Sequence, residues 1–242
     1  MITKAEINFI RSLGDKRQRA KHGVFVVEGI KSISEMSLAG LKMEALYTTT
    51  DGAGKNIKPS EMERISALKS PTEHLALFRI PKHELDIEQI KSDITLVLDD
   101  VQDPGNLGTI IRLADWFGIK QIVCSPATAD AFNPKTIQAT MGAIARVNVI
   151  YTPLDTFFEQ TKEVVCCGTF LEGENIYSAE LPQPAIIVMG NEGNGISDKV
   201  ANHINKRITI PPYPQKVNTV ESLNVAMATA IVCAEFRRRL KK

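Results

Sequence analysis

The stretch ITIPPYPQKVNTVESLNVAMATAIVCA, residues Ile208 to Ala234, decides the fold of the second half of this chain. From Leu223 to Val232 nearly every residue is apolar, a pattern that predicts a helix packed on most sides. Ser222 is the predicted N-cap, and Glu221 beside it favours the positive end of the helix dipole. A capped, buried helix accounts for these residues except Asn224, because a buried amide costs free energy unless partners satisfy it.

The length and composition of the chain bound its class. With 242 residues it can hold one large domain or two modest ones, and we predict two. The content of 43% hydrophobic and 24% charged residues is that of a soluble globular protein and excludes general disorder. No segment approaches the roughly 20 apolar residues of a membrane span, and the first residues lack the apolar centre of a secretory signal. We therefore predict a cytoplasmic protein.

The cysteine spacing gives little evidence of a cofactor, and the distribution of charge marks two basic clusters. The four cysteines form no CxxC pair and have no matching histidine spacing, so we predict no metal site and no redox motif. A net charge of +1 gives no global argument for a polyanionic partner. Locally, basic side chains crowd a segment near the N-terminus (Lys16, Arg17, Arg19, Lys21, His22) and the C-terminus (Arg237, Arg238, Arg239, Lys241, Lys242). Each cluster either binds phosphates or forms a solvated face.

The first third of the chain alternates predicted helices and strands. Helices are predicted at residues 4–13, 30–39 and 60–67, with Ser60 as the cap of the last, and strands at 24–29, 46–47 and 74–80. This order predicts a small α/β/α unit. The charged stretch KHELDIEQIKSD, residues 82–93, is the predicted linker. We place the domains at residues 1–90 and 91–242.

The second part alternates more strongly. Buried strands are predicted at residues 94–100, 121–125, 147–150, 164–170, 185–190 and 208–211, and helices at 107–116, 134–141, 154–159 and 198–202. Short connections cannot link parallel neighbours, so strands joined by helices predict a parallel sheet. Ligands then belong at the carboxyl ends of its strands.

Three loops at predicted strand ends carry unusual polar residues. The first, Asp99 to Gly118, presents Asn106 and Arg112; the glycine-rich turn GNEGNG, Gly190 to Gly195, presents Glu192; and the third runs from Ile210 to Asn224. Singly, each is explained by a helix cap, a strand-to-helix turn or a core helix. Together they favour one shared site.

Other glycine-loop and nucleophile chemistries fit poorly. The turn at Gly190 has the spacing G-x-x-G-x-G and not the G-x-G-x-x-G of dinucleotide-binding folds, and no G-x-x-x-x-G-K-[ST] phosphate loop is present. The histidines are scattered, so hydrolysis by a catalytic triad has little support.

The same three segments match the motifs of a known family, in order. Asp99 to Gly118 matches DxxxDPxNxGxxxRxAxxFG, Gly190 to Gly195 matches GxEGxG, and Ser222 to Val225 matches SLNV. Residues 94–240 thus resemble the SpoU, or TrmH-type, RNA ribose 2′-O-methyltransferases of the SPOUT superfamily. The segment from Lys16 to Gly29 looks like part of the substrate-binding domain that many members carry.

The resemblance implies an α/β fold with a deep trefoil knot in a parallel-sheet methyltransferase domain, which binds S-adenosylmethionine in the knot, preceded by the small α/β/α domain. By similarity the catalytic pocket is lined by Asn106, Arg112, Glu192, Ser222 and Asn224. Cofactor contacts are implied for Thr169, Gly190, Ile210 and Leu223. Family members are homodimers. In one respect this chain differs from the family: its link from Pro212 to Glu221 is longer than usual and has no glycine.

The implied activity is methyl transfer from S-adenosylmethionine to a ribose 2′-hydroxyl, in ribosomal RNA in preference to transfer RNA. Lys16, Arg17, Arg19 and Lys21 are the candidate RNA contacts. Glu192 and Arg112 are the candidates for taking the proton of the 2′-hydroxyl. Because a guanidinium stays protonated, we expect Arg112 instead to hold a phosphate next to the target ribose. The alternatives are a non-catalytic RNA-binding protein of the same fold and a methyltransferase acting on proteins or small molecules.

Overall fold

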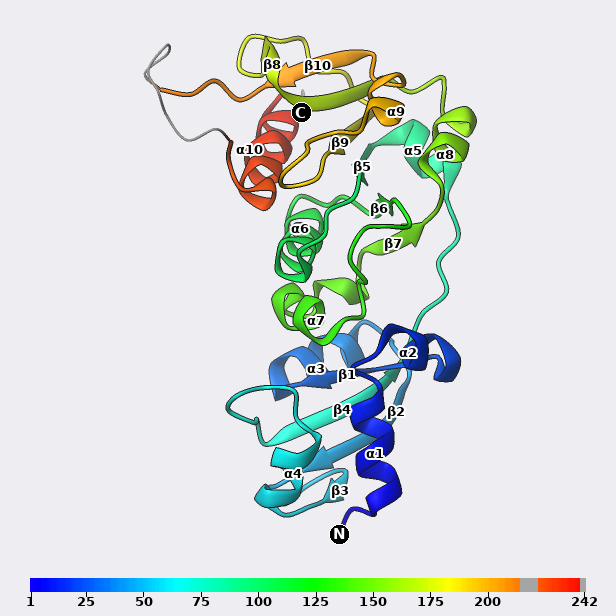
Figure 1. Ribbon diagram of the computed structural model, residues 1–242, viewed down its shortest axis with the longest axis vertical. Helices are drawn as coiled ribbons and strands as arrows, with labels where there is room; N and C mark the ends of the chain where they lie inside the picture. The colour runs from blue at the N-terminus through cyan, green and yellow to red at the C-terminus, as the bar shows by residue number, and fades with distance from the viewer. Residues whose placement is uncertain (214–221, 240–242) are drawn as a thin grey trace. The chain divides into compact units, whose positions relative to one another are not determined.

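The computed structural model describes residues 1–213 and 222–239 (Figure 1). Its contacts divide the chain into two compact units. Unit 1 comprises Met1–Lys82 and Asp130–Arg146, and unit 2 comprises His83–Ala129 and Val147–Lys242. The contacts thus assign to unit 1 a segment, Asp130–Arg146, that no sequence pattern set apart from its neighbours.

Unit 1 is built on a four-stranded sheet in the order β1-β4-β2-β3. β4 (His74–Arg79) runs antiparallel to both β1 (Val24–Glu28) and β2 (Met43–Thr48), and the short β3 (Lys55–Asn56) runs parallel to β2. The strands at residues 24–29, 46–47 and 74–80 were all predicted, because each is a short apolar run bounded by polar residues.

Helices cover both faces of this sheet, which confirms the predicted α/β/α unit. α1 (Lys4–Ser12) and α4 (Pro59–Ile65) pack their apolar faces into one core with β1 and β4. α3 (Ile30–Leu38) and the segment carrying α7 (Pro134–Thr140) and the short helix η1 (Ala143–Ala145) contact the sheet elsewhere. Phe132 of that segment lies against Phe25 of β1, with ring centroids 4.9 Å apart. The basic cluster near the N-terminus forms a helix of its own, α2 (Lys16–His22).

The start of α4 corrects one prediction. Ser60 was expected to cap this helix, but the helix begins at Pro59 with Lys58 as the N-cap residue. Proline is well suited to the first helical position because its missing N–H is not needed there. Glu61 accepts a hydrogen bond from the Lys58 amide at 2.8 Å, so the capping carboxylate lies one turn into the helix as the spacing requires.

Unit 2 contains a six-stranded sheet in the order β10-β8-β9-β5-β6-β7, and all of its pairings are parallel. The predicted parallel sheet is therefore confirmed. Its strands are β5 (Ile94–Leu98), β6 (Gln121–Cys124), β7 (Asn148–Tyr151), β8 (Cys166–Asn175), β9 (Ala185–Met189) and β10 (Lys206–Thr209). Non-consecutive strands are neighbours at its centre, where β9 lies between β8 and β5.

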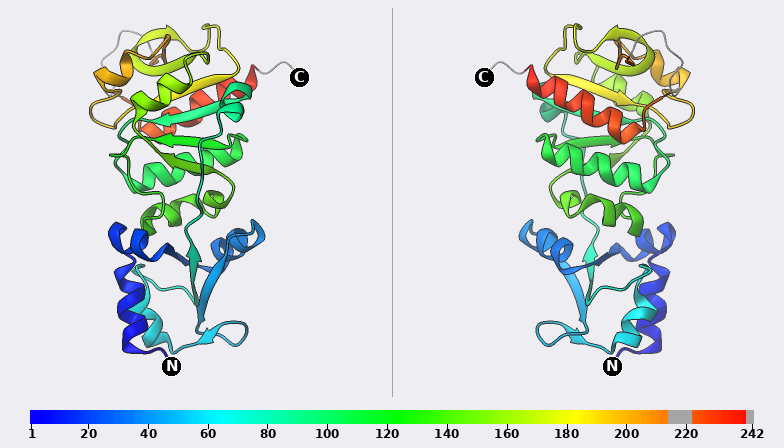
Figure 2. Two further views of the ribbon diagram at one scale, coloured as in Figure 1. Left: turned by 90° about the vertical axis from the view of Figure 1, so that its right-hand side faces the viewer. Right: turned by 90° about the vertical axis from the view of Figure 1, so that its left-hand side faces the viewer.

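The helices of unit 2 lie on both faces of the sheet (Figures 1 and 2). α6 (Pro104–Trp116) and α10 (Val225–Arg238) lie side by side on one face. α5 (Ile87–Ser92), α8 (Leu154–Gln160) and α9 (Asp198–Ala201) contribute to the apolar core on the other. The predicted linker at residues 82–93 thus contains a helix, α5, which docks through buried Ile90. In the described part of the chain no helix is long and apolar enough to cross a membrane.

α10 differs from its prediction in two ways. Its N-cap is Asn224 and not Ser222, because the Asn224 side chain accepts hydrogen bonds from the amides of Ala226 and Met227. The helix is also not packed on most sides within one chain, since Met227 is 60% exposed. Its buried face carries Val225, Ala226, Thr229, Val232, Cys233, Glu235 and Phe236. The apolar run therefore marks a helix with one exposed apolar side.

Candidate functional site

A chain of side-chain hydrogen bonds joins the three loops that the sequence singled out, all within unit 2. The amide nitrogen of Asn106 donates to Glu192 at 2.9 Å, and the amide nitrogen of Asn224 donates to the carbonyl oxygen of Asn106 at 2.9 Å. Asn106 lies in the first turn of α6, Glu192 in the turn after β9, and Asn224 at the start of α10. These residues are 86 and 118 positions apart in sequence, so only the fold brings them together.

Glu192 also holds the start of α6. Its carboxylate accepts hydrogen bonds from the backbone amides of Gln102 and Asp103, each at 3.2 Å. Asp103 in turn caps the helix by accepting from the Asn106 amide at 2.9 Å. These amides belong to the positive end of α6, where a carboxylate is favoured. The helix was predicted to begin at residue 107, and Pro104 at its first position extends it to Pro104.

The same hydrogen bonds set the charge state of Glu192. Burial by itself raises the pKa of this carboxyl, but hydrogen bonds from Asn106 and from backbone amides outweigh burial and lower the pKa below its usual value. Glu192 is therefore ionised at neutral pH and is a weak proton acceptor. In this arrangement it acts as a fixed acceptor that orients the Asn106 amide.

The glycine-rich turn after β9 is held closed by its own backbone. Asn191 and Gly195 exchange two hydrogen bonds of 2.9 Å, and Gly195 has a φ of +68°, which favours glycine. A Cβ atom at Gly190 would lie 2.2 Å from the carbonyl carbon of Gly195. Gly190 is thus required by close backbone packing, whereas a Cβ at Gly193 would lie no nearer than 3.6 Å to another group.

Two residues that sequence reasoning passed over fasten the first two loops together. The side-chain amide of Asn191 donates to the carbonyl oxygen of Asp100 at 2.8 Å, while its oxygen accepts from the amides of Gly193 and Asn194. Asp99, which is 6% exposed, accepts from the Ser197 amide at 2.7 Å. Both residues stand inside the quoted motifs, but Asn and Asp in turns are usually local caps, so their types gave no signal of this long-range role.

Two of the four predicted cofactor residues, Gly190 and Ile210, directly follow strands, whereas Thr169 lies within β8 and Leu223 precedes α10. Thr169 of β8 donates to the Val188 carbonyl oxygen at 3.2 Å, and Gly190 is buried directly after β9. Ile210 directly follows β10 and is half-buried, and Leu223 is 48% exposed. The unusual link from Pro212 to Glu221 falls largely on residues 214–221, which lie outside the described residues.

The charges of the predicted cofactor residues and their surroundings are compatible with S-adenosylmethionine. The four predicted cofactor residues are neutral, and Glu192, two positions from Gly190, supplies a carboxylate held in its charged form. A positively charged sulfonium is compatible with a neutral pocket that has a carboxylate nearby, and it would be disfavoured beside a cation.

Arg112 and Ser222 do not join the hydrogen-bonded chain. Arg112 is exposed, and it lies six residues after Asn106, roughly 240° around α6. Its side chain has no hydrogen-bond or ion-pair partner within residues 1–213 and 222–239. Ser222 is exposed, two residues before the capping Asn224. The structure therefore brings together Asn106, Glu192 and Asn224 and leaves Arg112 and Ser222 outside this chain of contacts.

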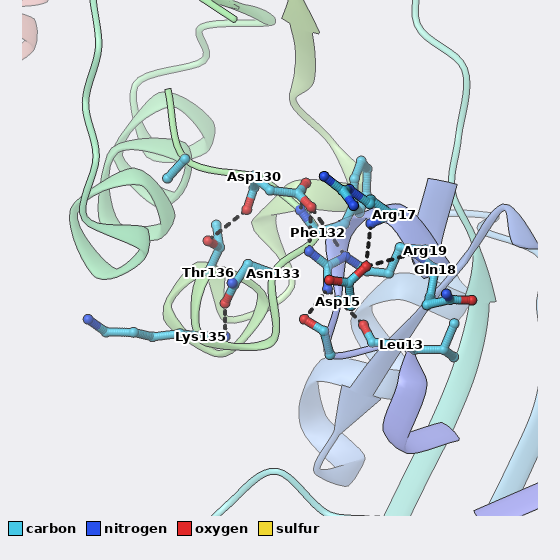
Figure 3. A network of polar contacts seen from close by, with 12 residues as sticks. Leu13, Asp15, Arg17, Gln18, Arg19, Asp130, Phe132, Asn133, Lys135 and Thr136 are labelled. Atoms are coloured by element: carbon cyan, nitrogen blue, oxygen red, sulfur yellow. Dashed lines mark hydrogen bonds and ion pairs between the residues drawn. The ribbon is translucent and has the colours of Figure 1, made fainter. Parts of the chain in front are cut away.

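The candidate RNA contacts of α2 divide into two kinds. Lys16, Arg17 and Lys21 are exposed, but Arg19 is 2% exposed and its guanidinium donates to Asp130 and to the carbonyl oxygens of Leu13 and Gly14 (Figure 3). The prediction of Arg19 as an RNA contact is therefore corrected: its position faces the core of unit 1 and its donors are used internally.

The arginines at the C-terminal end of α10 are also used internally. Arg237 pairs with Asp93 at 2.6 Å and donates to the Phe117 carbonyl oxygen, while Arg238 and Arg239 both pair with buried Glu235. These contacts lower the pKa of Glu235 to about 2, chiefly through the hydrogen bond from Arg238. The three arginines therefore help to anchor α10, whereas Lys241 and Lys242 of the predicted cluster lie outside the described residues.

Comparisons with known proteins agree with the motifs. A model of the SpoU rRNA Methylase family matches residues 93–234, and a model of the MRM3-like substrate binding domain matches residues 4–76. The chain is 29% identical over 241 residues to the 23S rRNA (guanosine(2553)-2′-O)-methyltransferase RlmP of Bacillus subtilis, with 94% of each covered. It is 28% identical over 225 residues to RlmB of Neisseria meningitidis, a 23S rRNA (guanosine-2′-O-)-methyltransferase, covering 86% of this chain and 88% of that protein.

Solved structures match over the whole chain. A TrmH-family protein from Porphyromonas gingivalis is 40% identical, with 99% of each chain covered and a TM-score of 0.85. An rRNA methyltransferase from Sinorhizobium meliloti, crystallised with AdoMet bound, is 26% identical, with 100% of this chain and 97% of that chain covered and a TM-score of 0.87.

Proposed function

Because this chain belongs to the SpoU rRNA methylase family, we propose that it transfers the methyl group of S-adenosylmethionine to a ribose 2′-hydroxyl of ribosomal RNA. The observation that carries this proposal is the chain of hydrogen bonds from Glu192 through Asn106 to Asn224. It joins three loops at the ligand-binding end of a parallel sheet. Ribosomal RNA is favoured because relatives that match over nearly the whole chain act on 23S rRNA.

Thr169, Gly190, Ile210 and Leu223 would hold the cofactor, which when bound supplies an activated methyl group on a positively charged sulfur. The task of the protein is then to hold the ribose hydroxyl in line with that methyl group. Positioning of this kind is worth several kcal/mol of the barrier, in the range of roughly 7–11 kcal/mol for well-oriented reactants. The leaving thioether is neutral, so little acid catalysis is needed.

Asn106 and Asn224 are the proposed ribose ligands. Within residues 1–213 and 222–239, each of the two side-chain amides donates one N–H and retains a second, and the Asn106 oxygen accepts from Asn224 alone. A 2′-hydroxyl both donates and accepts, which suits a pair of amides. Glu192 fixes their orientation: because it is an acceptor only, the Asn106 amide must turn its nitrogen toward Glu192 and its oxygen toward Asn224.

Arg112 is the proposed phosphate ligand next to the target ribose. Its planar guanidinium suits bidentate contact with a phosphate, and its charge would lower the proton affinity of the neighbouring hydroxyl. A permanently protonated guanidinium is a poor base, which argues against direct proton removal by Arg112. Its exposure and its lack of a partner in the described part of the chain leave it available for RNA.

We further propose that the active form is a homodimer whose interface includes α6 and α10. These helices lie side by side, and both expose large apolar side chains: Trp116 is 81% exposed and Met227 is 60% exposed. Burying these two side chains against a second copy removes apolar surface from water. A dimer would also let Arg112, which points away from Asn106, serve the site of the partner subunit. The cytoplasmic location stays a prediction.

The decisive experiment maps ribose 2′-O-methylation in cellular RNA with and without the protein. We expect one or a few ribosomal positions to lose the modification when the protein is absent. If the lost 2′-O-methylation is confined to transfer RNA, then transfer RNA and not ribosomal RNA is the substrate. In parallel, labelled methyl incorporation into bulk RNA tests the non-catalytic alternative, because a pure RNA-binding protein transfers no label even where it binds both RNA and S-adenosylmethionine.

A further inference from the structure

A cavity of about 180 Å³ in unit 1 has no assigned role. Its apolar lining comes from Ile10 of α1, Val26 of β1 and Ile65 of α4, all of which are buried. The rest of the lining is formed by Arg11, Gly14, Ser66, Ala67 and Pro134. All of these residues belong to unit 1, including Pro134, which comes from the segment Asp130–Arg146.

One buried arginine holds two walls of this pocket together. The Arg19 guanidinium donates to the carbonyl oxygen of Gly14 at 2.8 Å. It also donates to Asp130 at 2.5 Å (Figure 3). Gly14 lines the pocket directly, and Pro134 follows Asp130 by four residues. The turn between them is fixed because the Asp130 carbonyl oxygen accepts from both the Asn133 amide and the Thr136 hydroxyl at 3.0 Å. The pocket is therefore preformed.

The charge around the opening favours an anionic polymer. Arg11, which lines the pocket and is exposed, has no ion-pair partner in the portions of the chain that the structure describes. Arg17 and Lys21 are exposed on α2, which begins two residues after Gly14. Two acidic side chains near the pocket are engaged in hydrogen bonds: Glu28 accepts from Ser66 at 2.5 Å and from the Ala67 amide at 2.8 Å, and Asp15 accepts from the Arg17 amide at 2.8 Å.

The volume of the pocket is sufficient for a single ring. An apolar protein cavity of about 150 Å³ holds benzene, so a cavity of about 180 Å³ accommodates one six-membered ring. Sequence-specific RNA recognition uses unstacked bases that lie against apolar or guanidinium surfaces. We propose that this pocket binds one unstacked pyrimidine base of the substrate RNA, with Arg11 at its open side. This inference rests on the proposed function in taking RNA as the substrate.

The test uses two fluorescent oligonucleotides, hexauridylate and hexaadenylate, and measures their dissociation constants by anisotropy at one fixed salt concentration. The key variant is Ala67→Leu, because Ala67 is exposed at the pocket and a larger side chain there fills the cavity without entering the core. The matched control is Ala39→Leu, an exposed alanine of unit 1 that follows α3 and does not line the pocket.

We expect the natural protein and Ala39→Leu to bind hexauridylate on the order of tenfold more tightly than hexaadenylate. Ala67→Leu should bind both with the weaker affinity, and Arg11→Gln should weaken hexauridylate more than hexaadenylate. Because adenylate strands stack on themselves, a preference alone is insufficient and the loss of preference in Ala67→Leu is the deciding result. Equal affinities in the natural protein, absence of binding, or an unchanged preference in Ala67→Leu would overturn the proposal.

Methyl transfer to ribosomal RNA, assayed in the same preparations, separates this inference from the proposed function. If the natural protein transfers no methyl group but keeps the uridylate preference and its sensitivity to Ala67→Leu, the function fails and the pocket stands. If it methylates ribosomal RNA while Ala67→Leu and Ala39→Leu bind both oligonucleotides alike, the function stands and the pocket fails.

Discussion

The two units each contain a polar network that joins distant parts of the chain, and the networks differ in how completely they are satisfied. In unit 1, Arg19 is 2% exposed and three of its nitrogens donate to protein oxygens. In unit 2, Asn106 is half-buried and Asn224 is exposed, and among the described residues each side-chain amide keeps one N–H without an acceptor. A closed network stabilises a fold, whereas a network with spare donors at the surface is ready to bind a ligand.

We expect the largest effect on stability and cofactor binding from a substitution in the glycine-rich turn that carries Glu192. Replacing Gly190 with Ala puts a Cβ atom 2.2 Å from the backbone of Gly195, so the turn must open. We expect a loss of about 4 kcal/mol in the free energy of unfolding, at the severe end for one substitution, together with loss of S-adenosylmethionine binding. Denaturant unfolding and calorimetric titration measure the two effects. Gly193→Ala is the control, because its Cβ meets nothing closer than 3.6 Å; equal behaviour of the two variants would refute the packing argument.

A substitution in the closed network of unit 1 should lower the stability of the protein and leave cofactor binding unchanged. Arg19→Ala leaves Asp130, which is 14% exposed, beside a cavity and without its ion pair. Removing one partner of a buried pair costs about 3 kcal/mol or slightly more. We expect this loss in thermal or denaturant unfolding, with an unchanged dissociation constant for S-adenosylmethionine. The control is Arg17→Ala, at an exposed position three residues after Gly14. It should change the free energy of unfolding by no more than about 0.5 kcal/mol. A stable Arg19→Ala variant would show that the pair is dispensable.

This contrast also explains what the sequence could and could not reveal. The parallel sheet was predictable because its strands are apolar throughout, as in β5 and β9, and because helices separate them. The joining of Asn106, Glu192 and Asn224 followed from placing all three at strand ends, where side chains converge. Both inferences rest on local patterns that the fold preserves.

The errors arose where long-range packing decides. Arg19 looks like its basic neighbours, but its guanidinium is buried by contacts with Leu13, Gly14 and Asp130, the last of which is 111 residues away. The segment Asp130–Arg146 has an ordinary helix pattern, so nothing local shows that it packs into unit 1. Ser222 is as good a cap by type as Asn224, but the helix begins at Val225, so it is Asn224 that accepts from the first helical amides while its nitrogen donates to Asn106.

Arg112 tests whether the open network of unit 2 acts with a residue that lies outside it. Arg112→Lys keeps the charge but removes the planar fork, which matters for a bidentate phosphate contact. We expect methyl transfer to RNA to fall roughly 10- to 100-fold, the range for losing one charge-assisted hydrogen bond of about 1.5–3 kcal/mol, while S-adenosylmethionine binding is retained. Single-turnover methylation and calorimetry separate the two quantities. Near-normal turnover would remove Arg112 from the mechanism.

The smallest effect concerns the charge of Glu192, whose pKa lies below the ordinary value of 4.5 because hydrogen bonds from Asn106 and backbone amides outweigh burial. A depressed pKa contributes stability that is present above pH 4.5 and is lost as the pH falls through the folded-state value. Asn106→Ala removes one of these donors, so its stability deficit should contain a part of about 1 kcal/mol, after solvent screening, that is present at pH 7 and vanishes in acid. Unfolding free energies of the natural protein and of Asn106→Ala, measured from pH 7 to pH 3, give this part as a convergence of their two curves. A constant offset between the curves reports only the lost contact with Asn224.

The control is Asn194→Ala, at an exposed position in the same turn as Glu192. Its curve of unfolding free energy against pH should stay parallel to that of the natural protein at every pH. Parallel curves for Asn106→Ala as well would mean that Asn106 does not hold Glu192 in its charged form.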